Sequence, residues 1–449
     1  MIEPSAPIES ILTAVAVKQA ASETMQALLQ RASEFANPLA ARLTGIALDP
    51  PVRKLADQLL DDYWADPARR QNLLTTGSAD REVIIGSGFH AAVYACVRVL
   101  SGYPKPLVVE RQPRAGGTFA MTAQPTFYLN SRNRAGNAGL AGDQRANLNF
   151  LPGAPIQAAN ISMAEYQTNT DMALIIRLAL AQFADVVTDT EVLAVSPAAS
   201  GVEIALPQRP AVPAGRVIDA RGLGDPTDQS VANGTTILTF GQFMQRMATA
   251  WPLRGVHRVA VLGGGDSAKC AVESCLGIAP QPPVAAAALD SIDQIDWYAT
   301  DLPDTCGQWQ STMRGRYQAI GRYLRPDRSG IRRLSVLTRR PRPIALPGSA
   351  LIDGRTYDLA ILCTGNQETS LPGLDATSFD EYRQPGTPVV ARKHYELPAF
   401  RVGPHARLPF TSEELEDGIA DIPGNAVSMF RTAPKTAALA ATLGPLPQN

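Results

Sequence analysis

The stretch EVIIGSGFHAAVYACVRVL, Glu82 to Leu100, decides the fold. A short apolar run is followed by a glycine-rich turn, by apolar residues at helical spacing, and then by a second apolar run, PLVV. This order of strand, turn, helix and strand predicts a βαβ unit. Gly86, Gly88 and Ala91 occupy the positions of the dinucleotide fingerprint, which serve the tight turn, the approach of a pyrophosphate and the packing of helix on strand.

The residues after the second apolar run fit the same interpretation. Glu110 lies 24 residues after Gly86 and ends the run, where a carboxylate accepts hydrogen bonds from ribose hydroxyls. Arg111 is its basic neighbour, and Gly116 and Gly117 follow in ERQPRAGGTF. Since glycine has no Cβ, the chain can pass close to a bound cofactor at these two positions.

A second unit of the same kind begins at residue 258, in RVAVLGGGDSAKCAVESCL. Gly263, Gly265 and Ala268 hold the three fingerprint positions, and Asp266 and Ser267 lie between the second and third. Two units of this kind predict two nucleotide sites in one chain.

Composition favours small-molecule partners. The 449 residues include 41 Lys and Arg against 42 Asp and Glu, so the net charge of -1 provides no field that attracts nucleic acid or an anionic membrane. No apolar run reaches 18 residues and the N-terminus is acidic, so we expect a soluble cytoplasmic protein. Five scattered cysteines fit a reducing compartment. The four histidines are too dispersed to suggest a metal site, and each is expected to be a surface or packing residue.

Two segments carry a resemblance to a known class of enzymes. ERQPRAGGTF resembles the segment that wraps the FAD in flavoproteins with two dinucleotide-binding domains, and GGGDSA resembles the NAD(P)H site of thioredoxin reductases and flavin-containing monooxygenases. The resemblance covers roughly residues 80–449 and implies FAD at the first turn and NAD(P)H at the second. Asp301 suits a free 2′-hydroxyl, whereas Arg314 and Arg316 suit a 2′-phosphate. NADPH is favoured slightly, and NADH stays open.

The resemblance also implies an α/β fold with two Rossmann-like, three-layer ββα domains. An NAD(P)H-binding domain, 225–358, is inserted into an FAD-binding domain made of 79–224 and 359–449. RVIDARGLG resembles the outward crossing, and YDLAILCTGN resembles the return, with Thr364 and Gly365 at the turn. The segment RVGP with Gly403, and the helix expected after Asn425, resemble the last region that contacts FAD.

Residues 1–78 lie outside the resemblance. Their apolar residues repeat at helical spacing, which predicts a helical extension of three or four segments. We expect this extension to pack against the rest of the chain or to form a homodimer.

The cysteines do not form a redox pair in the pattern of this class. No cysteine lies between Cys96 and Cys270, and none lies just before the second glycine turn. Cys270 and Cys275 are separated by roughly 140° around a helix, so a disulfide between them is sterically excluded. Cys96 and Cys363 lie in apolar runs, and all four are predicted to be packing residues.

With disulfide reduction set aside, the resemblance implies a monooxygenase in which NAD(P)H reduces the flavin and O2 forms a C4a-(hydro)peroxyflavin. This species would oxygenate a natural-product-like small molecule at N, S or C. The segment FYLNSRNRAG resembles the part of flavin monooxygenases that approaches the flavin. Asn130 is therefore the catalytic candidate, and Arg132 and Arg134 are candidate contacts to cofactor phosphate or substrate.

One departure keeps alternatives open. The segment GQFMQRMATAWPLRG lacks the histidine and glycines of the usual monooxygenase fingerprint between the two domains. The alternatives are an NAD(P)H-dependent flavin reductase or electron-transfer oxidoreductase without oxygenation, and a binding or scaffold protein that retains the FAD fold.

Overall fold

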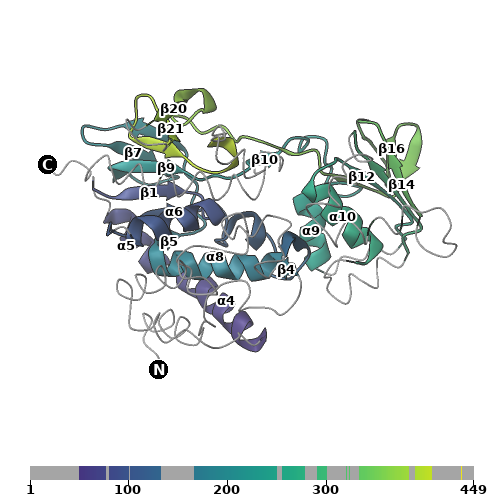
Figure 1. Ribbon diagram of the computed structural model, residues 1–449, viewed down its shortest axis with the longest axis horizontal. Coiled ribbons are helices and arrows are strands. Elements are labelled where there is room, and N and C mark those ends of the chain that lie inside the picture. The colour runs from purple at the N-terminus through teal and green to yellow at the C-terminus, as the bar shows by residue number, and fades with distance from the viewer. Residues whose placement is uncertain are drawn as a thin grey trace.

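The computed structural model gives the course of most of the chain from residue 50 onward. The residues that the structure describes are 50–76, 80–100, 102–132, 166–249, 255–278, 291–300, 333–383 and 390–406, with Ile320, Tyr323 and Thr436. They form two domains that lie side by side (Figure 1).

The first domain is built on a seven-stranded sheet with the order β20-β21-β22-β9-β1-β2-β5. From β22 to β5 the neighbouring strands are parallel, and β20 and β21 extend the sheet as antiparallel strands. Strands β1, β2 and β9 are buried along their whole length, as parallel strands covered on both faces are. The strand bounds are β1 Glu82–Ile85, β2 Leu107–Val109, β5 Asp185–Val187, β9 Arg216–Asp219, β20 Phe379–Arg383, β21 Val390–His394 and β22 Ala399–Arg401.

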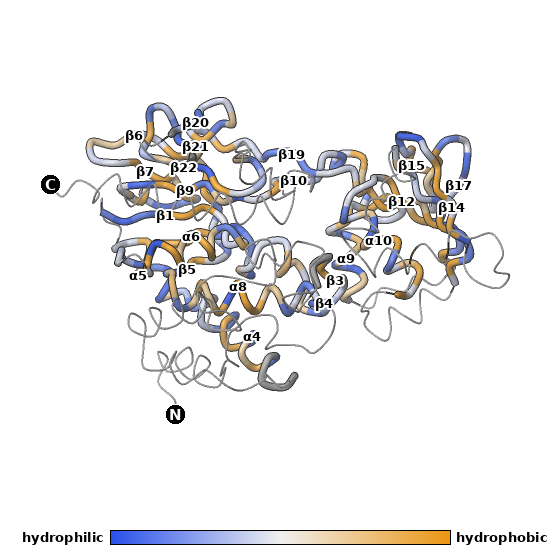
Figure 2. Tube along the Cα trace, in the orientation of Figure 1, coloured by the Kyte–Doolittle hydropathy of each residue, from blue (hydrophilic) through white to orange (hydrophobic). Residues whose placement is uncertain are grey.

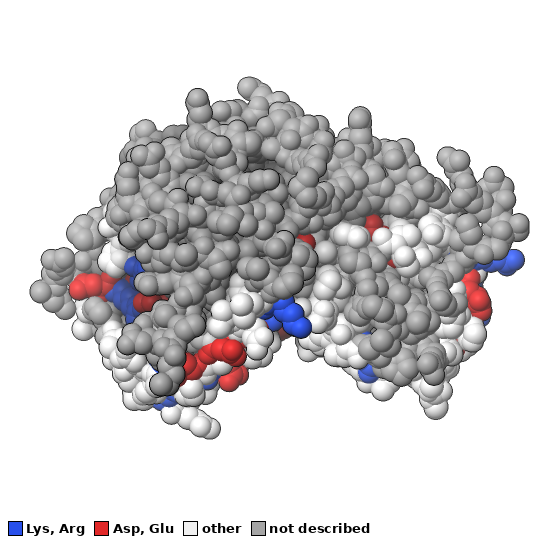
Figure 3. Space-filling view, turned by 90° about the horizontal axis from the view of Figure 1, so that it is seen from below, with Lys and Arg blue, Asp and Glu red and all other residues white. Residues whose placement is uncertain are grey.

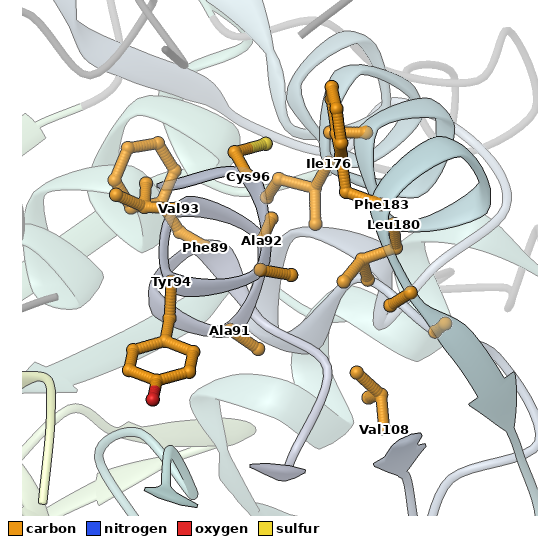
Figure 4. Packing of buried hydrophobic residues seen from close by; sticks show 14 of the residues in the cluster. Phe89, Ala91, Ala92, Val93, Tyr94, Cys96, Val108, Ile176, Leu180 and Phe183 are labelled. Carbon is orange, nitrogen blue, oxygen red and sulfur yellow. The ribbon is translucent and has the colours of Figure 1, made fainter. Parts of the chain in front are cut away.

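Different layers cover the two faces of this sheet. Helices α6 (Phe89–Leu100) and α8 (Asn169–Phe183) pack on one face, where Ala92 and Cys96 lie beside Ile176 and Leu180 (Figure 4). A three-stranded antiparallel sheet packs on the other face and shares a hydrophobic cluster with β1 and β2. Its strands are β6 Ala194–Pro197, β7 Val202–Ala205 and β8 Val212–Ala214. The predicted three-layer ββα arrangement is thus confirmed.

Short elements complete this domain. Strand β3 (Tyr128–Arg132) pairs with β4 (Tyr166–Thr168), and α8 begins directly after β4. Thr168 and Asp171 close the start of α8 as a capping box. The single-turn 3-10 helices are η1 Gly117–Ala120, η3 Ala376–Ser378 and η4 Pro404–Ala406.

The segment before the first strand is helical and belongs to this domain. Helix α4 (Pro50–Ala65) ends where Asp66 caps α5 (Pro67–Thr75), which has a proline in its first turn. Ala56, Leu60 and Trp64 repeat at every fourth residue of α4 and join the core around α6 and α8. The prediction of helix is confirmed for these two segments. Helix α4 buries its apolar stripe in the first domain, so it packs against the rest of the chain, which is one of the two roles expected of the extension. Residues 1–49 lie outside the described residues.

The second domain repeats the first. Its sheet is parallel throughout, with the order β11-β18-β12-β13-β14. Two helices cover one face and a three-stranded antiparallel sheet covers the other. The bounds are β11 Ile237–Thr239, α9 Phe240–Ala248, β12 Arg258–Leu262, α10 Asp266–Leu276, β13 Gln294–Tyr298, β14 Arg333–Leu337, β15 Ile344–Leu346, β16 Ser349–Ile352, β17 Arg355–Tyr357 and β18 Leu359–Leu362. In both domains the hydrophobic residues gather in the strands and in the helices packed on them (Figure 2).

The chain crosses between the domains twice. It leaves the first domain through β10 (Asp225–Pro226) and returns through β19 (Asn366–Gln367), and these two strands pair antiparallel. The first domain is therefore discontinuous, as predicted. The predicted return at residue 359 is wrong, however, because β18 pairs with β11 and β12 and so belongs to the second sheet.

A segment of the first domain packs on the second. Phe127 lies in the hydrophobic cluster of α9 and α10, and its ring centroid is 6.0 Å from that of Phe240. The sulfur of Cys270 in α10 is 4.0 Å from the carbonyl oxygen of Tyr128. Strand β3 therefore begins at the junction of the two domains.

Charged side chains are visible on the described part of one face. In Figure 3 the described acidic and basic residues lie in small groups of both signs. No helix among the described residues is long and apolar enough to cross a membrane.

The role of α4 in the core can be tested with a matched pair of leucines. Leu60 is fully buried, whereas Leu55 in the same helix is 54% exposed. We expect Leu60→Ala to lower the free energy of unfolding by about 2–5 kcal/mol, and Leu55→Ala to change it by less than about 0.5 kcal/mol. Urea unfolding of the full chain checks both values, and equal effects would contradict the assignment of α4 to the core.

Candidate dinucleotide-binding sites

The first turn lies at the carboxyl end of the first sheet. Gly86 has φ +97°, and its N–H donates to the carbonyl of Val109 at 2.8 Å. A Cβ at Gly86 would come within 2.6 Å of the carbonyl oxygen of Ala220, which follows β9. Ala91, in the first turn of α6, is fully buried. Only glycine fits the turn, and β1 lies between β2 and β9 at a topological switch point, where ligands of open parallel sheets bind.

The carboxylate of Glu110 holds this turn in place. Its Oε2 accepts hydrogen bonds from the N–H and the hydroxyl of Ser87, at 2.9 and 2.6 Å, and its Oε1 accepts from the N–H of Gln112 at 2.8 Å. A carboxylate has about four acceptor positions, and three are used here. The predicted bond to a ribose hydroxyl would use the fourth.

The Gly-Gly segment lies directly against the first turn. The N–H of Gly116 donates to the hydroxyl of Ser87 at 3.0 Å, and a Cβ at Gly117 would be 2.8 Å from the Cα of Gly88. Both glycines have positive φ, +122° and +62°. Glycine is needed here because the segment packs against the backbone of the fingerprint turn, and its predicted approach to a bound cofactor stays a prediction.

The second turn repeats the first. Gly263 has φ +129°, its N–H donates to the carbonyl of Tyr298 at 2.8 Å, and a Cβ would overlap the carbonyl oxygen of Cys363 after β18. Gly265 is the N-cap of α10, with no side-chain cap and open space where a Cβ would point. Asp266 and Ser267 are the first two residues of the helix.

Both helix starts suit a phosphate group. The first N–H groups of an α-helix have no partner within the helix and carry its positive dipole end. In α10 the cap leaves them without a side-chain acceptor, and Ala268 is fully buried against the sheet, as its fingerprint position predicts. The residues present fit a dinucleotide diphosphate at each turn.

The two-domain arrangement is similar to that of solved flavoproteins. The ornithine hydroxylase of Pseudomonas aeruginosa matches with a TM-score of 0.52 at 14% identity, over 81% of this chain and 100% of that chain. The Kutzneria ornithine N-hydroxylase matches with a TM-score of 0.51 at 14% identity, over 81% and 99%. A thioredoxin reductase of Lactococcus lactis matches with a TM-score of 0.49 at 13% identity, over 81% and 98%.

The chain has the fold of flavoproteins with two dinucleotide-binding domains. No protein-family model matches the sequence. No curated protein matches it either.

Several other predicted site residues of this flavoprotein fold lie at two places, the crossing between domains and strand β3. Arg111 is exposed and pairs with Asp225 of β10 at 2.9 Å, so its guanidinium lies toward the crossing between domains. Thr364 and Gly365 follow β18 and lie at the same crossing, where the carbonyl of Gly365 accepts from the N–H of Thr227. Asn130 and Arg132 belong to β3, which begins at the domain junction. The other candidates, Arg134, Asp301, Arg314, Arg316 and Asn425, lie outside the described residues.

The four described cysteines are buried thiols, which confirms their prediction as packing residues. Cys270, Cys275 and Cys363 share the core of the second domain. Burial raises the pKa of the Cys96 and Cys363 thiols well above the ordinary value. A thiol that stays protonated is a poor nucleophile, so these two side chains are unsuited to disulfide exchange.

An ionic network at the crossing was not foreseen from the sequence. Asp219 at the end of β9 accepts from Arg221 at 2.8 Å and from Arg401 at 3.0 Å, and Arg401 also pairs with Glu368 at 2.7 Å. Burial opposes ionisation of Asp219, but the two guanidinium groups outweigh it and hold the pKa of this carboxyl below its usual value. The network joins β9 and β22 to the returning chain.

A second ionic network ties α4 to the loop that follows Glu110. Arg114 pairs with Asp57 and with Asp61, the latter at 2.9 Å. Arg177 of α8, fully buried, pairs with the same two carboxylates at 3.0 and 2.7 Å. The loop that carries Gly116 is therefore held from the side of the N-terminal helix.

His90 is buried, which agrees with the packing role that was one of the two expected for each histidine. It lies in the first turn of α6 and is 5% exposed. Its Nε2 is buried and has no hydrogen-bond partner in the described part of the chain. Burial lowers the pKa of His90 to about 4, so the imidazole is neutral at physiological pH.

The steric role of the second turn gives a prediction. Gly263→Ala would place a methyl group on the backbone of Cys363, whereas Gly255→Ala, also at positive φ, meets open space. We expect a loss of about 1 kcal/mol for Gly255→Ala and of about 3 kcal/mol or more for Gly263→Ala. Urea unfolding compares the two, and equal losses would show that the overlap does not matter.

The neutral His90 gives a pH dependence. Between its folded pKa of about 4 and the unfolded value of 6.5, the unfolded chain binds more protons. The free energy of unfolding of the wild type, compared with that of His90→Phe, is therefore greatest above pH 6.5. The difference falls by roughly 3 kcal/mol as the pH is lowered to 4. Urea unfolding of both proteins from pH 7 to 4 measures it. A pH-independent difference would contradict the burial of a neutral imidazole.

Proposed function

We propose that the chain is an FAD-dependent monooxygenase that uses NADPH and O2 to oxygenate a small molecule at nitrogen, sulfur or carbon. The overall reaction consumes NADPH, a proton, O2 and the substrate, and yields NADP+, water and the oxygenated product. The observation that carries the proposal is the duplicated glycine turn, once in each of two adjoining domains.

The two sites have different proposed ligands. FAD binds at the turn of Gly86 and Gly88, with its diphosphate at the start of α6 and a ribose hydroxyl on Glu110. The Gly-Gly segment, Gly116 and Gly117, lies beside this turn and supports the assignment. NADPH binds at the turn of Gly263, Gly265 and Ala268, where Asp266 and Ser267 begin α10.

The residues around the sites favour oxygenation over disulfide reduction. The described cysteines are all buried, so none of them supplies an exposed dithiol to accept electrons. FAD, when bound, supplies the transfer of electrons from NADPH to O2 and of one oxygen atom to the substrate. The Kutzneria hydroxylase of the same fold was solved with reduced FAD, NADP+ and L-ornithine, which supports this pairing of cofactors.

Asn130 is the proposed catalytic residue. Its strand, β3, begins against α10 of the second domain, since the carbonyl of Tyr128 lies 4.0 Å from the sulfur of Cys270. The proposed role is that the Asn130 amide hydrogen-bonds the reacting groups, and the start of its strand at the domain junction supports it. We also propose that nine further residues contact the cofactors. They are Arg111, Arg132, Arg134, Arg314, Arg316, Thr364, Gly365, Gly403 and Asn425.

The absorption spectrum of the flavin bound to the purified protein tests the proposal. Anaerobic NADPH should bleach the bound FAD, and faster bleaching by NADPH than by NADH would establish the preference. With 18O2 and a panel of amines and thioethers, one labelled oxygen atom should enter the product. Anaerobic turnover with quinones and no label in any product would instead indicate a reductase. A flavin that NADPH does not bleach would indicate a binding or scaffold protein.

Asn130→Ala gives a sharper test of the catalytic assignment. We expect product formation to fall on the order of 10²-fold while NADPH still reduces the flavin at the wild-type rate, with peroxide released instead. Asn72→Ala, at an exposed residue of helix α5, is the control and should change neither rate. Unchanged product formation by Asn130→Ala would remove this residue from the catalytic site.

A further inference from the structure

The buried imidazole of His90 has an unused hydrogen-bonding atom in the first turn. Its Nε2 is shielded from solvent and has no partner among the described residues. A buried polar atom without a partner costs about 1–3 kcal/mol, and a hydrogen bond to a ligand group would offset this cost. The ring nitrogen is therefore able to take a ligand group as its partner.

The ring is fixed at the start of α6. Gly403, with φ +92°, lies against it, and a Cβ at this glycine would be 3.2–3.3 Å from three ring atoms. The ring of Phe89 is oriented edge-on to it, with centroids 6.0 Å apart. A side chain larger than glycine at residue 403 would press on the ring.

Ser87, the other polar side chain of the turn, already has hydrogen-bond partners. The hydroxyl of Ser87 donates to Glu110 and accepts from the N–H of Gly116. The turn GSGFHA contains no lysine or arginine. His90 is therefore the polar side chain of this turn that remains for a ligand.

The second turn has a polar residue at the same position. His90 and Ser267 both come two residues after the second fingerprint glycine and directly before the buried alanine, Ala91 or Ala268. Each is a residue of the first helical turn, where N–H groups attract an anion.

We infer that the Nε2–H of His90 donates a hydrogen bond to the diphosphate of the dinucleotide bound at the start of α6. This inference rests on the proposed function, which assigns FAD to this turn. Phosphate oxygens only accept hydrogen bonds, so the neutral tautomer that carries its proton on Nε2 is the one that binds. Lowering of the His90 pKa by burial agrees with a neutral donor.

The affinities of the full chain for FAD and for ADP, which shares the diphosphate, test the inference. His90→Phe keeps a ring of similar size without the nitrogens, and we expect it to weaken both ligands by about 10- to 100-fold. His90→Gln restores an N–H near the position of Nε2 and should recover most of the affinity. His257→Phe, at a histidine side chain that is 58% exposed in the second domain, is the control and should bind both ligands like the wild type.

The outcomes separate this inference from the proposed function. Wild-type affinity of His90→Phe for both ligands would overturn the inference, and so would weaker FAD binding with unchanged ADP binding, because the contact would then lie on the flavin half. A wild-type protein that binds neither FAD nor ADP would overturn the proposed function itself.

A measurement on the wild type covers the case in which His90→Phe fails to fold. In protein labelled with 15N-histidine, ADP should shift one imidazole Nε2 resonance and couple it to phosphorus. Absence of that shift at saturating ADP would overturn the inference.

Discussion

A backbone carbonyl that faces a glycine fixes the geometry of both sites. At Gly86 the carbonyl belongs to Ala220, and at Gly263 it belongs to Cys363. Each carbonyl follows the strand beside the glycine's own strand, so a side chain there would force the parallel pair apart. The same contact lets the chain turn sharply from strand into helix and leaves the helix start at the sheet edge. The position of the phosphate sites depends on this steric constraint.

The layers around the turns follow from the same plan in both domains. A central parallel strand, buried on both faces, carries a helix on one face and a three-stranded antiparallel sheet on the other. The domains differ in how they are secured. The first has an additional antiparallel pair and helix α4, and its ionic network at Asp219 holds the crossing between domains.

The loop after Glu110 is held from two directions. Glu110 and Ser87 bind its beginning and its glycines, while Asp57 and Asp61 of α4 bind Arg114 from the other side. These ion pairs fix the position of the loop but add little to the free energy of unfolding, because desolvation of the ions opposes their attraction. The N-terminal helix is thus part of the frame of the first site.

The sequence by itself determined the two strand-turn-helix units, the inserted second domain and the buried state of the four described cysteines. Each depends on contiguous residues, since the backbone freedom of glycine and the spacing of apolar side chains act within one turn or one strand. Only the tertiary structure decided the return after β18, the place of α4 in the core, the pairing of Arg111 with Asp225 and the burial of His90. These depend on partners that are remote in the chain, and a local pattern contains no information on which strand or charge lies beside it in space.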